Sequence, residues 1–325
     1  MKLISGLLAL VMIPSVSFAN DYLNEGLYVG NQNPFRGIFN IPRHRPNSEL
    51  SAGAYRSSFQ LEIHNSFTGV DVGNESIFID GETYVGRLAV ERGFSDGWRA
   101  GFELPIVSHQ GGFLDSIIDD WHDAFSLDGF DRGDAPEDLL LYRYIDGESL
   151  DISVREKNTD IGDLVLTMGK RWENSGGSSL FRIEVKLPTG DAESLMGSGG
   201  VDVGVRVQTT RKISRRGTLY GGLGFAWLET GDVLAELRQN WAGTFTLGWS
   251  WQQWSRVALK VQLDGQTSPY KDTEIQQLGD ESMQLSFGAS FLLSDKSVVD
   301  IGVIEDEWKV NVSPDFGVLV RYQRY

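Results

Sequence analysis

The chain has 325 residues, with 45 acidic and 29 basic side chains, a formal net charge of −16 at pH 7 and no cysteine. A strongly acidic surface argues against nucleic acid as a partner. Without cysteine, disulfide scaffolds, thiol chemistry, cysteine-ligated zinc and a lipoprotein anchor are all excluded. We expect no cofactor and no metal site.

Residues 1–19 have the features of a secretory signal peptide. Lys2 precedes an apolar run over 3–13, and Ser17 and Ala19 form a small-x-small cleavage site. A membrane anchor would need roughly 20 apolar residues, which this run does not reach. We therefore expect export and cleavage after Ala19. No later apolar run is long enough for a transmembrane helix.

Alternation of apolar and polar residues predicts β-strands. Between Phe181 and Leu187, apolar residues alternate with Arg182, Glu184 and Lys186, so one face of the strand is apolar and the other charged. The same two-residue period recurs along most of the chain and indicates an antiparallel sheet. It is clear near 201–208, 219–227, 241–251, 256–263 and 284–291.

The chain divides into about twelve such segments, an even number, as bacterial outer-membrane barrels have. We therefore predict an all-β fold, a single antiparallel transmembrane β-barrel that spans 50–325. The strands are expected near 50–67, 76–93, 97–108, 160–172, 178–188, 200–213, 217–229, 238–251, 254–265, 282–293, 297–305 and 315–325.

The predicted connections alternate in length, which is a second argument for a barrel. Outer-membrane barrels have short periplasmic turns and long outer loops, whereas a soluble β-sandwich has no reason to sort its loops by parity. The pattern places both termini in the periplasm. Tight turns are expected at 95–97, 173–177, 214–216, 252–253 and 294–296, and long loops at 69–75, 109–160, 188–199, 229–238, 266–281 and 306–314.

Aromatic residues lie near the predicted strand ends, where the interfacial girdles of such barrels are found. The chain also ends on Tyr325, which resembles the terminal signal read by the barrel assembly machinery. We expect that machinery and outer-membrane lipid as partners. The aromatic residues are Trp98, Trp172, Trp227, Trp241, Trp249, Trp251, Trp254 and Tyr325.

If the apolar faces meet lipid, the charged faces line the lumen. Charges of both signs inside a barrel must be paired or hydrated. The lumen is therefore either filled by ion pairs or forms a narrow wet channel, and the sequence leaves both open. The predicted lumen-lining residues are Arg56, Glu62, His64, Arg87, Glu91, Arg99, Glu103, Arg171, Arg182, Glu184, Lys186, Asp202, Arg206, Arg256, Lys260 and Arg321.

The long extracellular loop, 109–159, contains a predicted amphipathic helix followed by a hairpin around 146–147. A cation near its acids is one possibility, but no calcium-loop spacing is present. A helix that caps the barrel mouth, with a solvated acidic face, is favoured. The cap residues are Leu114, Ile118 and Trp121 on the apolar face and Asp115, Asp119 and Asp123 on the other.

The N-terminal segment 20–49 is not expected to form strands, because Pro34, Pro42 and Pro46 interrupt regular pairing. It is either a periplasmic segment that links to the barrel or one tucked into the lumen.

Hydrolytic chemistry is not favoured by the few histidines of the chain. Ser108 precedes His109, but adjacent strand residues point to opposite faces, so this pair makes no direct nucleophile–base contact. We do not expect an enzyme.

Several stretches resemble a domain-of-unknown-function family of Gram-negative outer-membrane β-barrel proteins, DUF3187. They are Arg36 to Phe39, Tyr84 to Glu91, Leu104 to Gly112 and the helix through Trp121 and His122. The resemblance covers nearly all of the chain after the signal peptide and implies an outer-membrane barrel, but no activity.

A second, short resemblance lies at the end of one predicted strand. The stretch Lys186 to Asp191, Lys-Leu-Pro-Thr-Gly-Asp, is similar to a motif of outer-membrane proteins associated with phenol degradation. Pro188 and Gly190 in it also suit a strand end and a turn.

These patterns together predict a barrel in the outer membrane that passes a small solute. The alternatives are a structural or surface-interaction barrel without transport and, less favoured, an outer-membrane hydrolase. The solute and the oligomeric state are not readable from the sequence.

Epitope insertion tests the predicted topology. Tags at Ser194 and Thr273, in long loops, should be labelled by antibody on intact cells. A tag at Ser214, in a tight turn, should be labelled only after the outer membrane is permeabilised. Labelling at Ser214 on intact cells would invert the topology.

Overall fold

The computed structural model describes residues 21–112, 139–147, 150–306 and 312–325. The predicted signal peptide lies outside these residues, and so does the predicted helix of the long loop. The cap residues Leu114, Asp115, Ile118, Asp119, Trp121 and Asp123 therefore stay a prediction.

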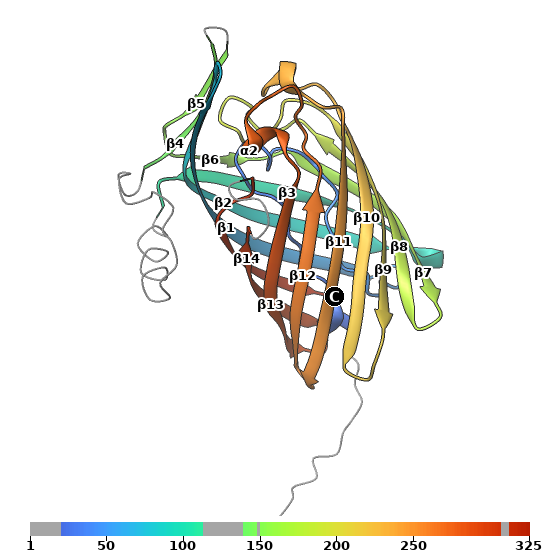
Figure 1. Cartoon of the computed structure of the whole chain (residues 1–325). Coiled ribbons are helices and arrows are strands. Elements are labelled where there is room, and N and C mark those ends of the chain that lie inside the picture. Colours follow the sequence, from blue (N-terminus) through green and yellow to red (C-terminus); the bar gives the residue numbers. More distant parts are fainter. Residues whose placement is uncertain (1–20, 113–138, 148–149, 307–311) are drawn as a thin grey trace, which may run out of the picture.

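The described strands form one sheet in which β1 pairs with β15, so the sheet closes into a barrel (Figure 1). The predicted antiparallel barrel of twelve strands is confirmed. Its wall consists of β1 (Tyr55–Val72), β2 (Glu75–Gly93), β3 (Trp98–Gln110), β7 (Leu164–Asn174), β8 (Gly177–Leu187), β9 (Asp202–Lys212), β10 (Gly217–Leu228), β11 (Trp241–Trp254), β12 (Val257–Gln266), β13 (Ser282–Ser294), β14 (Ser297–Glu305) and β15 (Phe316–Arg324).

Shorter elements extend the wall or lie in the loops. We call the end of the barrel with the long loops the outer end, following the predicted topology. The β4–β5 hairpin pairs with the outer end of β2, and β6 pairs with the outer end of β3. Among the described residues, no helix is long and apolar enough to cross a membrane. The shorter elements are β4 (Leu141–Asp146), β5 (Leu150–Val154), β6 (Asn158–Ile161), α2 (Gln276–Gly279) and the 3₁₀ turns η1 (Asp21–Asn24), η2 (Ser95–Gly97) and η4 (Ala235–Leu237).

One connection differs from the prediction. The segment 69–75 is not a long loop, because β1 and β2 stay paired up to Val72 and Glu75 and turn at two residues, of which Gly73 has a φ of 59°. A positive φ at this position suits glycine in a tight hairpin. The strands extend this far because Ile77 and Ile79 of β2 are buried at the outer end of the barrel.

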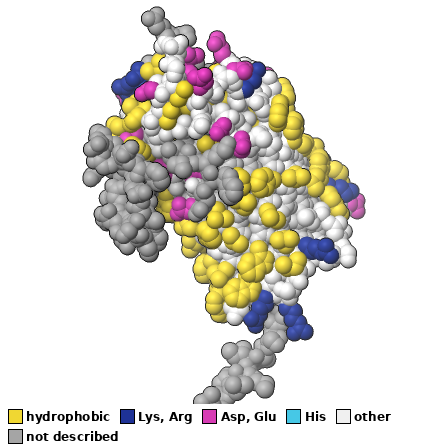
Figure 2. All heavy atoms as spheres, in the orientation of Figure 1, with side chains coloured by type: hydrophobic (Ala, Val, Ile, Leu, Met, Phe, Trp, Pro, Cys, Tyr) yellow, Lys and Arg dark blue, Asp and Glu magenta, His cyan; other side chains and the backbone are white. Residues whose placement is uncertain are grey.

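The outward faces of the wall strands are apolar and exposed. Leu223 is 70% exposed and Leu247 is 54% exposed, and many other large apolar side chains share this face. Figure 2 shows these apolar side chains over the lower part of the barrel, with acidic side chains near the loop end above. An apolar surface of this extent is expected where a protein contacts lipid.

The position of this apolar face can be tested on β9. Val207, 50% exposed near the middle of the strand, should not tolerate arginine, because a cation at mid-bilayer costs roughly 2–4 kcal/mol. Ile213, 57% exposed beside the tight turn at the end of β9, should tolerate the same change at about 0–1 kcal/mol. Urea titration of Val207→Arg and Ile213→Arg in lipid vesicles measures both costs; equal costs would contradict the assigned depth.

Candidate functional site

The barrel interior contains residues 21–50, which we call the plug (dark blue in Figure 1). It begins at the end of the barrel with the tight turns, which is the predicted periplasmic end, where the ring of Tyr22 stacks on Tyr325 with centroids 3.9 Å apart. It runs to the outer end, turns between Asn33 and Phe39, and returns to β1. Of the two placements that the sequence leaves open for this segment, the structure has the one inside the barrel.

Side chains, and not strand pairing, hold the plug. None of the strand pairings among the described residues includes it. Asn31 Oδ1 accepts from the Asn33 backbone N at 2.9 Å, and Asn33 Oδ1 accepts from the Phe35 N at 3.0 Å, which shapes the outer turn. The Gln262 side chain accepts from the Leu27 N at 2.8 Å and donates to the Leu27 O at 3.0 Å. Wall amides thus satisfy plug backbone groups that a sheet would otherwise pair.

The wall strands turn a charged face toward the plug. Of the predicted lumen-lining residues, all except Arg171 and Arg256 are buried. Arg171 is half-buried and donates from Nε to the Asn47 O at 2.6 Å. The prediction for Arg256 is wrong: it is exposed in the turn after β11, because this strand continues through a register shift to Trp254. Whether the buried residues line a solute path stays a prediction.

At mid-lumen, the parts of the plug before and after its turn contact the wall and each other through Tyr28 and Arg45. Arg45 Nη1 lies 2.7 Å from Glu103 Oε2 on β3, and Arg45 Nε lies 2.7 Å from Glu184 Oε1 on β8. The guanidinium also lies 4.7 Å from the centroid of the Tyr28 ring. The Tyr28 hydroxyl donates to Glu103 Oε1 at 2.9 Å. Charge-assisted hydrogen bonds of this kind are the stronger ones in proteins.

Lys186 connects the wall to the outer turn of the plug. Its Nζ lies 2.8 Å from Asp163 Oδ2 and 2.9 Å from Asp202 Oδ2, and it donates to the Ile38 O at 3.0 Å. Asp163 reaches the lumen because the pairing of β3 passes from β7 to β6 at 162–163, where the wall bulges.

Three guanidinium groups share the carboxylate of Glu91 on β2. Arg56 Nη2 bonds to Glu91 Oε2, Arg182 Nη1 lies 3.0 Å from Oε1, and Arg99 Nη1 lies 3.7 Å from Oε2. We call Arg56, Arg99 and Arg182 the arginine cluster. In the part of the chain that the structure describes, Arg99 Nε and the Nε and Nη2 of Arg182 have no hydrogen-bond acceptor.

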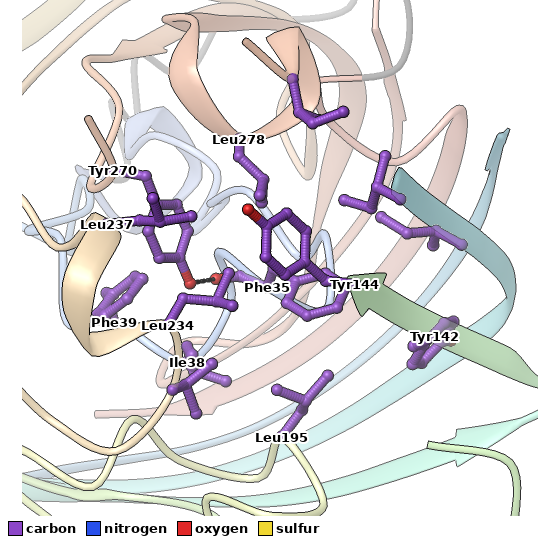
Figure 3. Close-up of a cluster of buried hydrophobic side chains, with 14 of the residues drawn as sticks. Phe35, Ile38, Phe39, Tyr142, Tyr144, Leu195, Leu234, Leu237, Tyr270 and Leu278 are labelled. Carbon is purple, nitrogen blue, oxygen red and sulfur yellow. Dashed lines mark hydrogen bonds between the residues drawn. The ribbon is translucent and has the colours of Figure 1, made fainter. Parts of the chain in front are cut away.

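An apolar cluster lies at the outer end, above this polar lumen (Figure 3). The Tyr270 hydroxyl donates to the Phe35 O at 2.6 Å. Arg36 donates to the Gln277 O at 3.0 Å and the Leu278 O at 2.6 Å, carbonyls in the last turn of α2 that lack helical partners. Burial lowers the pKa of Arg36 to about 10, which leaves it charged at neutral pH. The plug contributes Phe35, Ile38, Phe39 and Ile41, β4 contributes Tyr142, and the segments between strands contribute Leu195, Leu234, Leu237 and Leu278 among others.

Two cavities adjoin each other between the plug and the wall of β2, β3 and the neighbouring strands. The outer one has a volume of about 60 Å³ and reaches Met196. The inner one has a volume of about 40 Å³ and reaches Arg56. Both are lined by Tyr28, Arg87 and Glu103, so these three side chains lie where the cavities meet. Each cavity has room for more than one water molecule.

The chain matches the model of the family described as protein of unknown function, DUF3187, over residues 2–324. The chain belongs to this family. None of the curated protein sequences matches it.

Among solved structures, an outer-membrane channel from Pseudomonas putida F1 is similar, with a TM-score of 0.56 and 13% identity, over 86% of this chain and 97% of that one. The NanC porin is similar with a TM-score of 0.47 and 9% identity, over 82% and 97%. The toluene transporter TbuX of Ralstonia pickettii is similar with a TM-score of 0.42 and 10% identity, over 85% and 90%. This DUF3187 protein has an outer-membrane β-barrel fold, and its apolar outer surface fits the outer membrane.

The structure describes three histidines of this DUF3187 chain, and one of them, His44, lies 5.0 Å from the Tyr220 ring and makes no hydrogen bond among the described residues. His64 Nε2 lies 3.0 Å from Glu62 Oε2. His109 lies 3.1 Å from Thr83 Oγ1 through Nδ1 and 3.3 Å from the Leu195 O through Nε2. None of these contacts joins a histidine to a serine.

Sequence analysis missed several residues of this interior. Asp300 is one: it lies 3.1 Å from Lys260 Nζ and 2.9 Å from Arg321 Nη2. It alternates with Val299 and Ile301, so the two-residue period was sufficient to place it inside. Tyr28 and Arg45 carry no such signal, because the plug is not periodic and its residues face the lumen on all sides.

The contacts of Arg36 predict that it holds the plug turn against α2. Arg36→Ala removes hydrogen bonds from a charged group, each of which contributes about 1.5–3 kcal/mol. The turn should then open more often. Because the chain has no cysteine, a single Ile38→Cys reporter, buried in the apolar cluster, can be labelled with a water-soluble maleimide.

We expect about tenfold faster labelling or more in the Arg36→Ala background, following the increased population of the open turn. Lys271→Ala is the control, since this exposed lysine lies in the same outer loop and pairs with Asp272. Equal labelling rates in both backgrounds would show that Arg36 does not hold the turn.

Proposed function

We propose that the protein passes a small solute across the outer membrane along the seam between the plug and the wall of β2 and β3. The observation that carries this proposal is the pair of adjoining cavities, which meet at Tyr28, Arg87 and Glu103. The outer cavity extends to Met196 in the loop 188–199, and the inner one extends to Gln323 on the last strand. A solute would therefore need only a small rearrangement at mid-lumen to move between them.

Unpaired polar atoms along the seam support its hydration. Gln60 Oε1 is buried without a hydrogen-bond partner among the described residues, and so is Arg87 Nη1, which lies 3.5 Å from Glu62 Oε1 without a hydrogen bond to it. Both residues line the inner cavity. Buried polar groups in native proteins are nearly always satisfied by protein or water. Water in the cavities supplies these missing partners and gives a polar solute a path that is already wet.

The way the plug is held also suits passage. It shares no strand ladder with the wall, so a local shift of the plug breaks side-chain contacts without opening the barrel. The apolar cluster at the outer end would have to open for entry from outside, and Arg36 is the main polar contact that holds the plug turn there.

The same apolar cluster favours a second candidate, a structural or surface-interaction barrel without transport. In that case the plug and the closed outer end serve only to fill the lumen and stabilise the wall. Conductance separates the two candidates. Catalysis is the least supported alternative, because the described histidines contact no serine hydroxyl.

Shortening Tyr28 tests the proposed path. Tyr28→Ala removes the ring between the two cavities and its hydrogen bond to Glu103. The refolded full chain in a planar bilayer should then show a conductance about twofold or more above that of the parent protein, because the constriction becomes wider.

Tyr322→Ala is the matched control, since Tyr322 is 40% exposed on the lipid face and should leave conductance unchanged. If neither the parent protein nor Tyr28→Ala conducts, while both migrate as folded barrels, the protein is not a channel and the structural candidate is correct.

A further inference from the structure

The inner cavity is lined by more positive than negative side chains. Arginines from the plug and from four wall strands face only two carboxylates there. The charged lining residues are Arg45, Arg56, Arg87, Arg182 and Arg321 against Glu91 and Glu103.

Part of this positive charge is balanced by carboxylates behind the lining. Arg45 lies 2.7 Å from Glu184 Oε1, and Arg321 Nη2 lies 2.9 Å from Asp300 Oδ2. The arginine cluster is different, because its three guanidinium groups share the carboxylate of Glu91. The other carboxylates that act on them are Glu184, whose Oε1 lies 4.0 Å from Arg182 Nε, and Glu25. The cluster therefore retains buried donors without an acceptor among the described residues.

Arg182 is the cluster member with the most unused hydrogen-bonding capacity. Its side chain is 3% exposed. Only Nη1 lies close to Glu91, at 3.0 Å, whereas Nε lies 4.0 Å from Glu184 Oε1, too far for a hydrogen bond. Nε and Nη2 have no acceptor in the described part of the chain, and the residue lines the inner cavity. A buried charged group with unmet donors is costly unless something in the cavity accepts from them.

We propose that the inner cavity is a binding site for an oxyanion, the carboxylate or phosphate group of the transported solute, with Arg182 as its principal ligand. The guanidinium group presents adjacent N–H donors in a planar fork that matches two oxygens of an oxyanion. Arg99 Nε also has no acceptor among the described residues, although Arg99, a member of the arginine cluster, does not line the inner cavity itself. The site deepens the proposed function, on which it rests, because it gives the chemical class of the solute.

Binding can be measured without conduction. The refolded full chain in detergent micelles is titrated with sodium acetate and, separately, with inorganic phosphate, at constant ionic strength maintained with sodium chloride. The readout is the set of arginine Nε–Hε signals in ¹⁵N-resolved NMR spectra. We expect saturable shifts of the Arg182 and Arg99 signals with at least one of the two probes, and the probe that saturates identifies carboxylate or phosphate as the preferred group.

Arg182→Gln should weaken the affinity for that probe by about tenfold or more, because the free donors are lost. Arg182→Lys is the second variant: it keeps the charge beside Glu91 but lacks the planar fork, and it should weaken binding as well. Arg238→Gln is the matched control, since Arg238 is also buried and has unpartnered donors but lies over the Phe39 ring, 3.9 Å from its centroid, outside the inner cavity. It should leave the affinity unchanged.

Two results would overturn the site: no saturable shift with either probe, or an equal loss of affinity in Arg238→Gln and Arg182→Gln. Neither result depends on current through the barrel, so the absence of an anion site would not contradict the proposal of a channel. Conversely, a Tyr28→Ala protein that binds the probe but does not conduct would contradict transport and support the anion site.

Discussion

Polar groups enclosed by a barrel wall must find partners inside it, and the whole interior of this protein is arranged by that requirement. The wall brings charges inward because its outer face is apolar, and strand alternation then forces every second residue into the lumen. The plug has backbone groups that no strand pairs. Side chains of the wall satisfy them, as Gln262 does for both backbone groups of Leu27. In turn, plug side chains pair the charges of the wall, as Arg45 does for Glu103 and Glu184.

This reciprocal pairing is uneven along the lumen. At the outer end the plug turn is packed among apolar side chains, and Arg36 donates to carbonyls of α2, although its Nη1 has no partner among the described residues. Around Glu91, three arginines share one carboxylate, and three of their donors have no acceptor in the part of the chain that the structure describes. A barrel whose interior served only stability would be expected to satisfy such groups. The donors of Arg182 that lack an acceptor lie beside the inner cavity, where a ligand or water can reach them.

The sequence predicts the strands of the wall, but it does not predict where the plug lies. Strand alternation needs only local residue order, so it located the twelve strands and buried Glu91, Arg182 and Lys186. The turns are predicted less accurately than the strands. Arg256 lies outside the lumen because a register shift lengthens β11, and the residues from Trp251 to Trp254 carry no sequence pattern that predicts this shift. The plug depends on contacts across more than a hundred residues, such as Arg45 with Glu184, and proline spacing cannot distinguish a linker from a lumen segment.

The stretch 186–191 shows how a short local motif can organise a distant part of the wall. Pro188 ends β8, and beyond it the chain continues to make side-chain bonds where a strand would pair. Thr189 Oγ1 accepts from the Leu164 N at 2.9 Å and donates to the Gly162 O at 2.8 Å. The Gly190 N donates to Asp163 Oδ1 at 2.9 Å.

These bonds hold the bulge that turns Asp163 into the lumen, where its other oxygen lies 2.8 Å from Lys186 Nζ. Gly190 cannot carry a side chain there, since a Cβ would come within 2.6 Å of the Met196 O. One small region therefore connects three parts of the structure: the bulge of the wall, the loop 188–199 and the plug. Thr189 and Gly190 bond to the bulge, and Lys186 bonds to both the bulge and the Ile38 carbonyl of the plug. A motif that the sequence marks only as a strand end and a turn is thus one of the points at which the wall holds the plug.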